Sequence, residues 1–175
     1  MVPRILNRSR SRGLTLAELL GTVGFVAILA SLAMYGLAKY LRHSKTVEAV
    51  GSTTAIGQAA CAYFNDSKPP RHFPPPSRAS VPASMDDVRG KRFQSAIGDW
   101  ATSPWHDMDF KISTPQFYAY SFDSQGTGPT AIATAIAHGD LDGNGVTSTF
   151  RATAASDDSL VAKVRGSVEE VEAEE

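Results

Sequence analysis

The sequence predicts an α+β fold in which one long N-terminal helix packs against a small antiparallel β-sheet head. Three observations predict this fold. A basic N-terminus is followed by about twenty uncharged residues and then by an amphipathic stretch with helical spacing. A proline-rich break interrupts the chain after that stretch. The second half holds short runs of aromatic and β-branched residues between glycine-containing turns, which is typical of strands.

The N-terminal segment predicts one membrane helix preceded by a basic stretch. Residues 1–13 carry four arginines and no acid, and residues 14–38 carry no ionisable group beyond position 18 except Tyr35. About twenty apolar residues at 1.5 Å per residue span a hydrocarbon core of roughly 30 Å. Basic residues stay on the cytoplasmic side, so we expect a single span with the N-terminus inside and the C-terminus outside.

Residues 39–65 continue the helix with an amphipathic pattern. Apolar residues recur at spacings of three and four among charged ones: Tyr40, Val47, Val50, Ala55, Ile56, Ala59, Ala60, Tyr63 and Phe64. Gly51 and Gly57 weaken the helical prediction in this half. Cys61 lies on the same helix and is expected to be a small buried hydrophobe.

Residues 66–84 contain six prolines and predict a polyproline-like connector on the surface. After it, a head over residues 85–165 is expected to begin with a short helical turn between Asp86 and Phe93, capped by Ser84, with Val88 facing inward. The acids and the histidine of residues 99–109 alternate with apolar residues, which favours a passage from loop to strand over a metal cluster.

Three strand patterns follow, at residues 117–122, 131–137 and 148–153. We expect them to form an antiparallel sheet on the outer half of the helix. Residues 166–175 are rich in glutamate and predict a solvated acidic tail. Cys61 is the only cysteine, so no internal disulfide forms and the contact between helix and sheet must stabilise the head.

The sequence of the loop at residues 140–145 has two interpretations. Asp140, Asp142 and Asn144 alternate and are followed by glycine, as at the start of a calcium loop, and they are the candidate calcium ligands. Arg151 occupies the twelfth position, where an EF-hand needs a bidentate acid, so an EF-hand is excluded. The other reading is a glycine-rich hairpin turn that needs no metal.

Composition argues against several function classes. With 175 residues and a formal net charge of −1, the chain suits one domain plus an appendage, and nucleic-acid binding through counterion release is not expected. The sequence holds no glycine-rich phosphate loop and no Gly-x-Ser-x-Gly motif, and its four histidines are scattered. We therefore expect a protein that is not an enzyme and needs no cofactor other than the calcium considered above.

Glu18 is the exception in the apolar stretch, because a carboxylate that enters the bilayer core costs free energy and suggests a partner. The segment from Arg12 to Leu20, with the sequence RGLTLAELL, resembles the class III signal of type IV pilins and pseudopilins. In that family a basic leader ends in glycine and the mature chain carries glutamate at its fifth position. Gly13 and Glu18 match both features, and Leu14 would be the first mature residue.

The resemblance implies that prepilin peptidase cleaves after Gly13 and methylates the new amine of Leu14. It implies that Glu18 pairs with the terminal amine of a neighbouring subunit during assembly. The chain departs from the family at Leu14, where an aromatic residue is usual, at Ala17, where a branched residue is usual, and at Tyr35, near which a proline is common. Cleavage would remove four of 17 basic side chains and none of 18 acidic ones, leaving 13 basic and 18 acidic side chains with a net charge of −5.

The implied function is a structural subunit of a type IV pilus, a major or minor pilin that inserts in the inner membrane and polymerises with other pilins through its helix. Its partners would be prepilin peptidase and the inner-membrane assembly machinery, and the extracellular filament would serve adhesion, motility or DNA uptake. One alternative is a pseudopilin of a type II secretion system, in a periplasmic filament. A second alternative is an unprocessed single-pass membrane protein with an outer binding domain.

Overall fold

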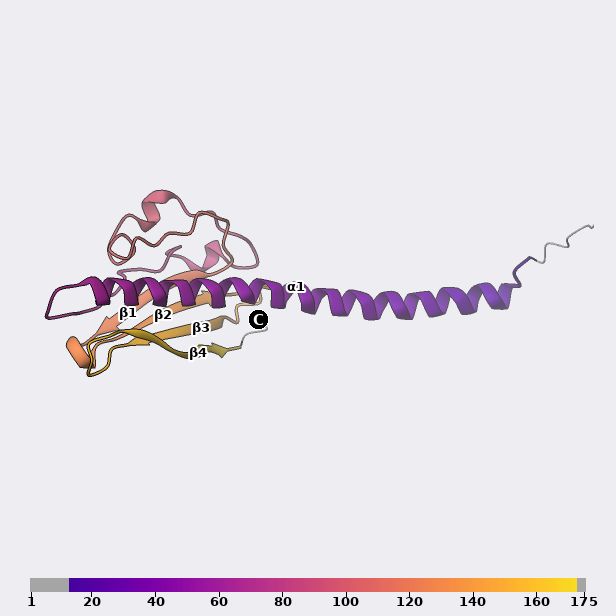
Figure 1. Ribbon diagram of the computed structural model, residues 1–175. Coiled ribbons are helices and arrows are strands. Elements are labelled where there is room, and N and C mark those ends of the chain that lie inside the picture. The colour runs from indigo at the N-terminus through magenta and orange to yellow at the C-terminus, as the bar shows by residue number, and fades with distance from the viewer. Residues whose placement is uncertain (1–12, 173–175) are drawn as a thin grey trace, which may run out of the picture. The chain divides into compact units, whose positions relative to one another are not determined.

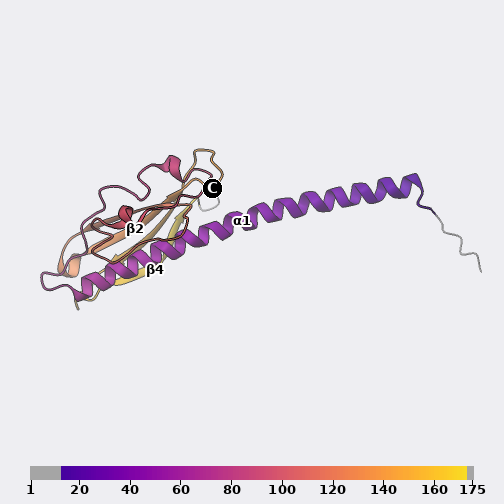
Figure 2. The same cartoon turned by 90° about the horizontal axis from the view of Figure 1, so that it is seen from above.

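The computed structural model describes residues 13–172 (Figure 1). The chain divides into two compact units, Met1–Tyr40 and Leu41–Glu175, and helix α1 (Leu16–Asp66) contributes residues to both. Three short 3-10 helices and four strands complete the second unit: η1 (Met85–Asp87), η2 (Ile97–Trp100), β1 (Ala119–Gln125), η3 (Gly128–Thr130), β2 (Ile132–Gly139), β3 (Ser148–Ala155) and β4 (Lys163–Val171). The predicted α+β layout, one long N-terminal helix packed on an antiparallel sheet, is confirmed at this level (Figures 1 and 2).

Helix α1 continues without a break through both glycines that weakened its prediction. Gly57 faces the sheet, where an added Cβ would lie 3.2 Å from Cγ2 of Val164 on β4, so its small size lets the helix approach that strand. The helix ends at Asp66, and the hydroxyl of Ser67 donates a 2.8 Å hydrogen bond to the carbonyl of Phe64. Consecutive prolines at 69 and 70 then prevent further helix.

The buried stripe of α1 differs from the predicted one. Thr46 and Thr53 are buried, whereas Tyr40, Val47 and Ala55 of the predicted stripe are exposed. The hydroxyl of Thr53 donates to the carbonyl of Ala49 at 2.7 Å, and that of Thr46 donates to the carbonyl of His43 at 2.8 Å. Because each hydroxyl finds a partner within its own helix, threonine can lie in the core without an unsatisfied donor.

The four strands form an antiparallel sheet in the order β1-β2-β3-β4, so each strand pairs with the next one along the chain. The three predicted strands are confirmed with shifted ends, and the predicted acidic tail is wrong, because residues through Val171 belong to β4. Val164 and Val168 alternate with exposed residues and pack against the core. Gly166 lies between them with a φ of 65°, and the register shifts at this place, so the strand pattern is interrupted and acidic composition outweighed it.

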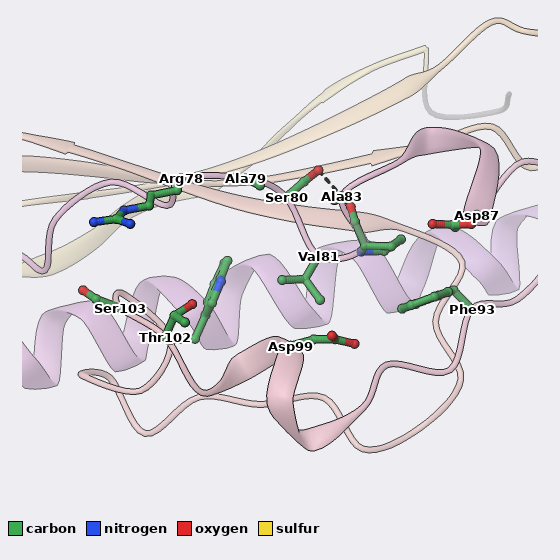
Figure 3. Close-up of a pocket in the computed structure, with 12 residues that line it drawn as sticks. Arg78, Ala79, Ser80, Val81, Ala83, Asp87, Phe93, Asp99, Thr102 and Ser103 are labelled. Atoms are coloured by element: carbon green, nitrogen blue, oxygen red, sulfur yellow. Dashed lines mark hydrogen bonds between the residues drawn. The ribbon is translucent and has the colours of Figure 1, made fainter.

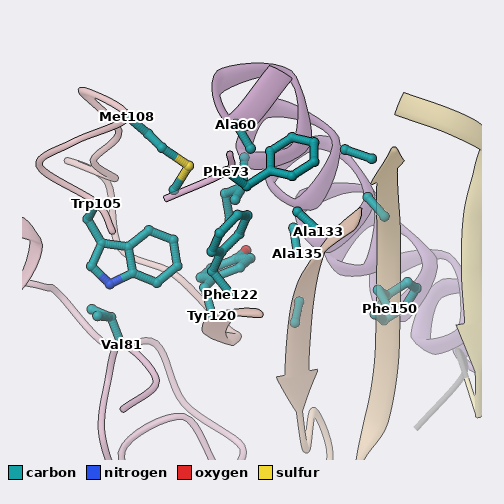
Figure 4. Packing of buried hydrophobic residues seen from close by; sticks show 14 of the residues in the cluster. Ala60, Phe73, Val81, Trp105, Met108, Tyr120, Phe122, Ala133, Ala135 and Phe150 are labelled. Atoms are coloured by element: carbon teal, nitrogen blue, oxygen red, sulfur yellow. The ribbon is translucent and has the colours of Figure 1, made fainter. Parts of the chain in front are cut away.

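Small side chains form the inner face of the sheet, and this face receives the outer half of α1 (Figure 4). Ala133 and Ala135 of β2 are almost fully buried, as are Ala152 and Ala154 of β3. Larger side chains fill the space around them, and Phe64 of α1 packs on Phe73 with ring centroids 4.9 Å apart. Alanine on the strands therefore leaves room for a helix that carries isoleucine and phenylalanine.

The proline-rich segment 66–84 is only partly a surface connector, which corrects the prediction. Phe73 is buried, and Val81 pairs with Tyr120 through two hydrogen bonds of 2.8 and 3.0 Å. Ser77 likewise donates its backbone N–H to Phe122 at 2.8 Å. Positions between the prolines keep their N–H groups, so the segment covers the outer edge of β1 and shields it from other strands.

In the region between the proline-rich segment and the sheet, one prediction is confirmed and another is wrong. Ser84 caps η1 and Val88 is fully buried, as predicted, but η1 covers Met85–Asp87 and does not continue to Phe93, which pairs with Gln116 instead. Residues 99–109 do not lead into a strand; they form part of η2 and a series of turns around an aromatic cluster. Trp100 packs edge-on against Trp105 and Phe110, with ring centroids 5.1 and 5.7 Å apart. Side-chain packing of these three rings replaces the expected backbone pairing.

Candidate functional site

The candidate processing and assembly site lies at the start of α1. Thr15 precedes the helix, and its hydroxyl accepts a 3.3 Å hydrogen bond from the backbone N–H of Glu18. In return, Oε2 of Glu18 accepts hydrogen bonds from the backbone N–H of Thr15 at 2.9 Å and from its hydroxyl at 2.7 Å. This reciprocal arrangement is a capping box, in which each side chain satisfies a donor that the first turn leaves unpaired.

The peptide bond after Gly13 lies outside the helix, three residues before its first residue, Leu16. An added Cβ at Gly13 would meet no atom within 4 Å, and Leu14 is 76% exposed. Non-helical, exposed backbone is the form that a peptidase can bind. The arginines of the predicted leader, at positions 4 to 12, lie outside the described residues.

Apolar side chains of α1 between Leu16 and Leu37 are exposed on every side of the helix; the large ones are Leu16, Leu19, Leu20, Val23, Phe25, Val26, Ile28, Leu29, Leu32, Met34, Tyr35 and Leu37. A helix that is apolar all round requires an apolar environment, either lipid or other helices. Helix α1 is long and apolar enough to cross a membrane, and the single span with its orientation stays a prediction.

Glu48 anchors the outer half of α1 to the sheet. Its Oε1 accepts a 2.8 Å hydrogen bond from the backbone N–H of Phe117 and a 3.3 Å hydrogen bond from the hydroxyl of Tyr120. Burial raises the pKa of Glu48, and this effect outweighs the opposing influence of both hydrogen bonds and of the charge on Arg92. Burial and the nearby charge of Glu48 raise the pKa of Tyr120 as well, so Tyr120 remains a donor.

The three calcium candidates lie in one loop, and the two carboxylates among them, of Asp140 and Asp142, have hydrogen-bond partners within it. Asp140 is buried, and its two oxygens accept backbone hydrogen bonds from Gly143 at 2.7 Å and Gly145 at 2.9 Å. The guanidinium of Arg89 lies 3.3 Å from Asp140. Exposed Asp142 accepts hydrogen bonds from the backbone N–H and the side-chain amide of Asn144, both at 3.1 Å. These contacts are those of a hairpin turn, and calcium binding stays a prediction.

Across residues 13–172, no group of three or more histidine, cysteine, aspartate or glutamate side chains could hold a metal ion. Cys61 is buried as predicted, and burial raises the pKa of its thiol to about 11. Such a thiol stays protonated at neutral pH and is a poor nucleophile. Cys61 is therefore a buried packing residue of α1.

A cavity of about 240 Å³ opens on the head between the proline-rich segment and the loop that carries η2 (Figure 3). Val81 and Trp105 contribute apolar surface to it, and Arg78 and Asp87 lie toward opposite ends of it in Figure 3. Asp99 also lines the cavity, but one of its oxygens accepts a 2.8 Å hydrogen bond from the backbone N–H of Ala96. The lining points to no particular ligand.

The sequence analysis assigned no role to two residues of these sites, Thr15 and Glu48. The spacing of Thr15 and Glu18, which is that of a capping box, could have identified the role of Thr15. The role of Glu48 had no such signal, because Phe117 lies 69 residues further along the chain.

No protein-family model, curated protein or solved structure matches this chain.

Proposed function

We propose that this chain is a structural subunit of a type IV pilus-type filament, cleaved after Gly13 and polymerised through the N-terminal half of α1. The observation that carries the proposal is the combination of the Gly13–Glu18 motif with a helix whose following residues are apolar and exposed on every side. Such a helix needs lipid before assembly and neighbouring helices after it. A membrane intermediate that becomes a filament core provides both.

The capping box supports a role for Glu18 in this process. Only Oε2 of Glu18 forms side-chain hydrogen bonds with the described residues, and it does so with Thr15, which lies on the mature side of the proposed cleavage site. The box therefore survives cleavage. We infer that Oε1 stays available for a cation, and that the amine of Leu14 on a neighbouring subunit supplies it. A charge pair of this kind in a low dielectric favours the matched register over others.

Cleavage is tested by the intact mass of the chain co-expressed with a prepilin peptidase. The expected product begins at Leu14 and carries one added methyl group. Gly13→Val should abolish cleavage without affecting folding, because the position is open. Gly21→Ala, at an equally open position inside the helix, is the matched control and should be processed normally. An uncleaved wild-type chain in the presence of active peptidase would contradict the proposal.

Assembly is tested with two variants of the capping box. Glu18→Ala removes both the cap and the inferred charge pair, whereas Thr15→Val removes the hydroxyl and keeps the carboxylate. If pairing between subunits drives assembly, sheared filaments should be lost only with Glu18→Ala. Equal loss in both variants would assign the effect to the cap, and normal filaments from Glu18→Ala would refute the pairing. A processed wild-type chain that yields no surface filaments would favour the secretion pseudopilin instead.

A further inference from the structure

The loop between β2 and β3 contains an asparagine followed directly by a glycine, Asn144 and Gly145, and both residues are exposed. An asparagine side chain and the backbone nitrogen of the next residue can close a succinimide ring, and glycine at that next position hinders the closure least. Gly145 has a φ of 92°, and an added Cβ there would meet no atom within 4 Å. The junction between the two residues is therefore open to ring closure and to water.

Hydrogen bonds of the folded loop act on the two groups that would react. The nucleophile is the backbone nitrogen of Gly145, whose N–H donates to Oδ2 of Asp140 at 2.9 Å. The electrophile is the side-chain carbonyl of Asn144, whose Oδ1 accepts a hydrogen bond from the backbone N–H of Val146 at 2.6 Å. An acceptor on the nucleophile can take up its proton, and a donor on the carbonyl oxygen stabilises the negative charge that develops there.

The proton acceptor is fixed inside the loop, and the leaving group lies in its exposed part. Asp140 is 1% exposed, and its Oδ1 accepts a 2.7 Å hydrogen bond from the backbone N–H of Gly143. The guanidinium of Arg89 lies 3.3 Å from Oδ2 of Asp140. The side-chain amide nitrogen of Asn144 donates to exposed Asp142 at 3.1 Å, so ammonia released there can leave to solvent.

We propose that the head modifies itself at this junction: Asn144 is deamidated through a succinimide formed with Gly145, and Asp140 accepts the proton. The bond between N of Gly145 and Cγ of Asn144 forms, and the bond between Cγ and Nδ2 breaks. The proton of Gly145 passes through Asp140 to Nδ2, which leaves as ammonia. One water then opens the ring and returns a proton to N of Gly145, so that position 144 becomes aspartate or isoaspartate without any redox change.

The product differs from the original loop in charge and, as isoaspartate, in backbone length. Asp142 accepts hydrogen bonds from the backbone N–H and the side-chain amide of Asn144, both at 3.1 Å. Deamidation removes the amide donor and places two like charges side by side, so the loop should loosen. The reaction runs in one direction in water, and the modified fraction therefore records the age of the chain. The inference concerns the head alone and depends on neither cleavage nor filament formation.

The test incubates the full chain in neutral detergent at 37 °C and pH 8 and follows its intact mass and its proteolytic peptides. The peptide that holds residue 144 should gain the mass difference between water and ammonia, with release of an equal amount of ammonia. Asn65 lies within α1, precedes Asp66 and is the internal reference that should stay unchanged.

Two glycine variants separate ring closure from a change in the loop backbone. Gly145→Ala should slow the mass gain at least roughly tenfold, because a Cβ at this position hinders ring closure. Gly143→Ala is the matched control, because it places alanine at another glycine of the same loop with a positive φ, 80°, and leaves the reacting junction intact. This control should react at the wild-type rate.

Asp140→Asn tests the proton acceptor and should slow the mass gain roughly tenfold. If this variant fails to fold, the two glycine variants decide; if it folds and reacts at the wild-type rate, the role of Asp140 is refuted. Three results would overturn the proposal as a whole: no mass gain at residue 144 in the folded chain, equal rates for both glycine variants, or a gain that requires unfolding in urea. The last result would mean that the hydrogen bonds of the loop protect the amide.

Discussion

Replacing Glu48 tests how the outer half of α1 is attached to the sheet. Glu48→Ala leaves the backbone N–H of Phe117 and the hydroxyl of Tyr120 without their acceptor, at residues that are 9% and 0% exposed. An unsatisfied buried donor costs about 1–3 kcal/mol, and the longer 3.3 Å bond contributes less than the 2.8 Å bond. We therefore expect Glu48→Ala to lower the free energy of unfolding by about 2–3 kcal/mol.

Glu48→Gln is the matched control, because it keeps a carbonyl acceptor at nearly the same place and removes the charge. The pKa of Glu48 is raised in the folded protein, so the folded state favours the protonated acid. The associated stability is fully present below the unfolded pKa of about 4.5 and is lost as pH rises through the folded pKa. Wild type should lose stability relative to Glu48→Gln over this range, with no further change above it.

Urea unfolding of the full chain in neutral detergent, followed by tryptophan fluorescence at pH 4 and pH 8, measures both effects. The two tryptophans, Trp100 and Trp105, are buried in the head and report on its unfolding. Equal destabilisation by alanine and glutamine would refute the hydrogen-bond argument. A difference between wild type and Glu48→Gln that does not change with pH would refute the burial argument.

Four further substitutions or treatments probe the head. Gly139→Ala would place a Cβ 2.5 Å from a ring carbon of Tyr118, so we expect a loss of about 1–3 kcal/mol in urea unfolding. Native Cys61, with a thiol pKa of about 11, should resist iodoacetamide at pH 8 and react only in denaturant, as mass spectrometry would show. Arg89→Ala leaves the buried carboxylate of Asp140 without its cation and should cost about 1–3 kcal/mol. If calcium binds this loop, adding it raises the Tm of the wild type, and an unchanged Tm contradicts the calcium prediction.

Local patterns in the sequence predicted the parts of the fold that local forces determine. Helix α1 was predictable because an apolar stretch and a three-to-four spacing adjoin without a proline, and Ser84 identified the start of η1 through its capping chemistry. Strand β4 was missed because Gly166 and the five glutamates of residues 166–175 conceal the alternation of Val164 and Val168. That strand forms through pairing with β3. The residues of one segment alone do not indicate such pairing with a distant segment.

The residues of the candidate sites likewise divide into those that the sequence predicts and those that it does not. Gly13, Leu14 and Glu18 are adjacent, so the motif and its capping chemistry are both present in one short segment. Contacts such as Glu48 with Phe117 exist only after the chain folds, because they join residues on α1 to residues beside β1. Sequence spacing predicts groups that share one helix face or one turn; it does not predict which distant backbone donor a carboxylate will reach.

The distribution of burial along α1 determines how variants of the assembly segment can be interpreted. Apolar side chains between Leu16 and Leu37 are exposed, whereas Ala49, Ile56 and Phe64 are fully buried in the core of the head. A substitution at Glu18 therefore removes no contact of that core and should leave head unfolding unchanged. Loss of filaments from such a variant then reports on insertion, processing or assembly. A variant at Glu48 acts in the opposite way, because any filament defect must first be corrected for the stability of the head.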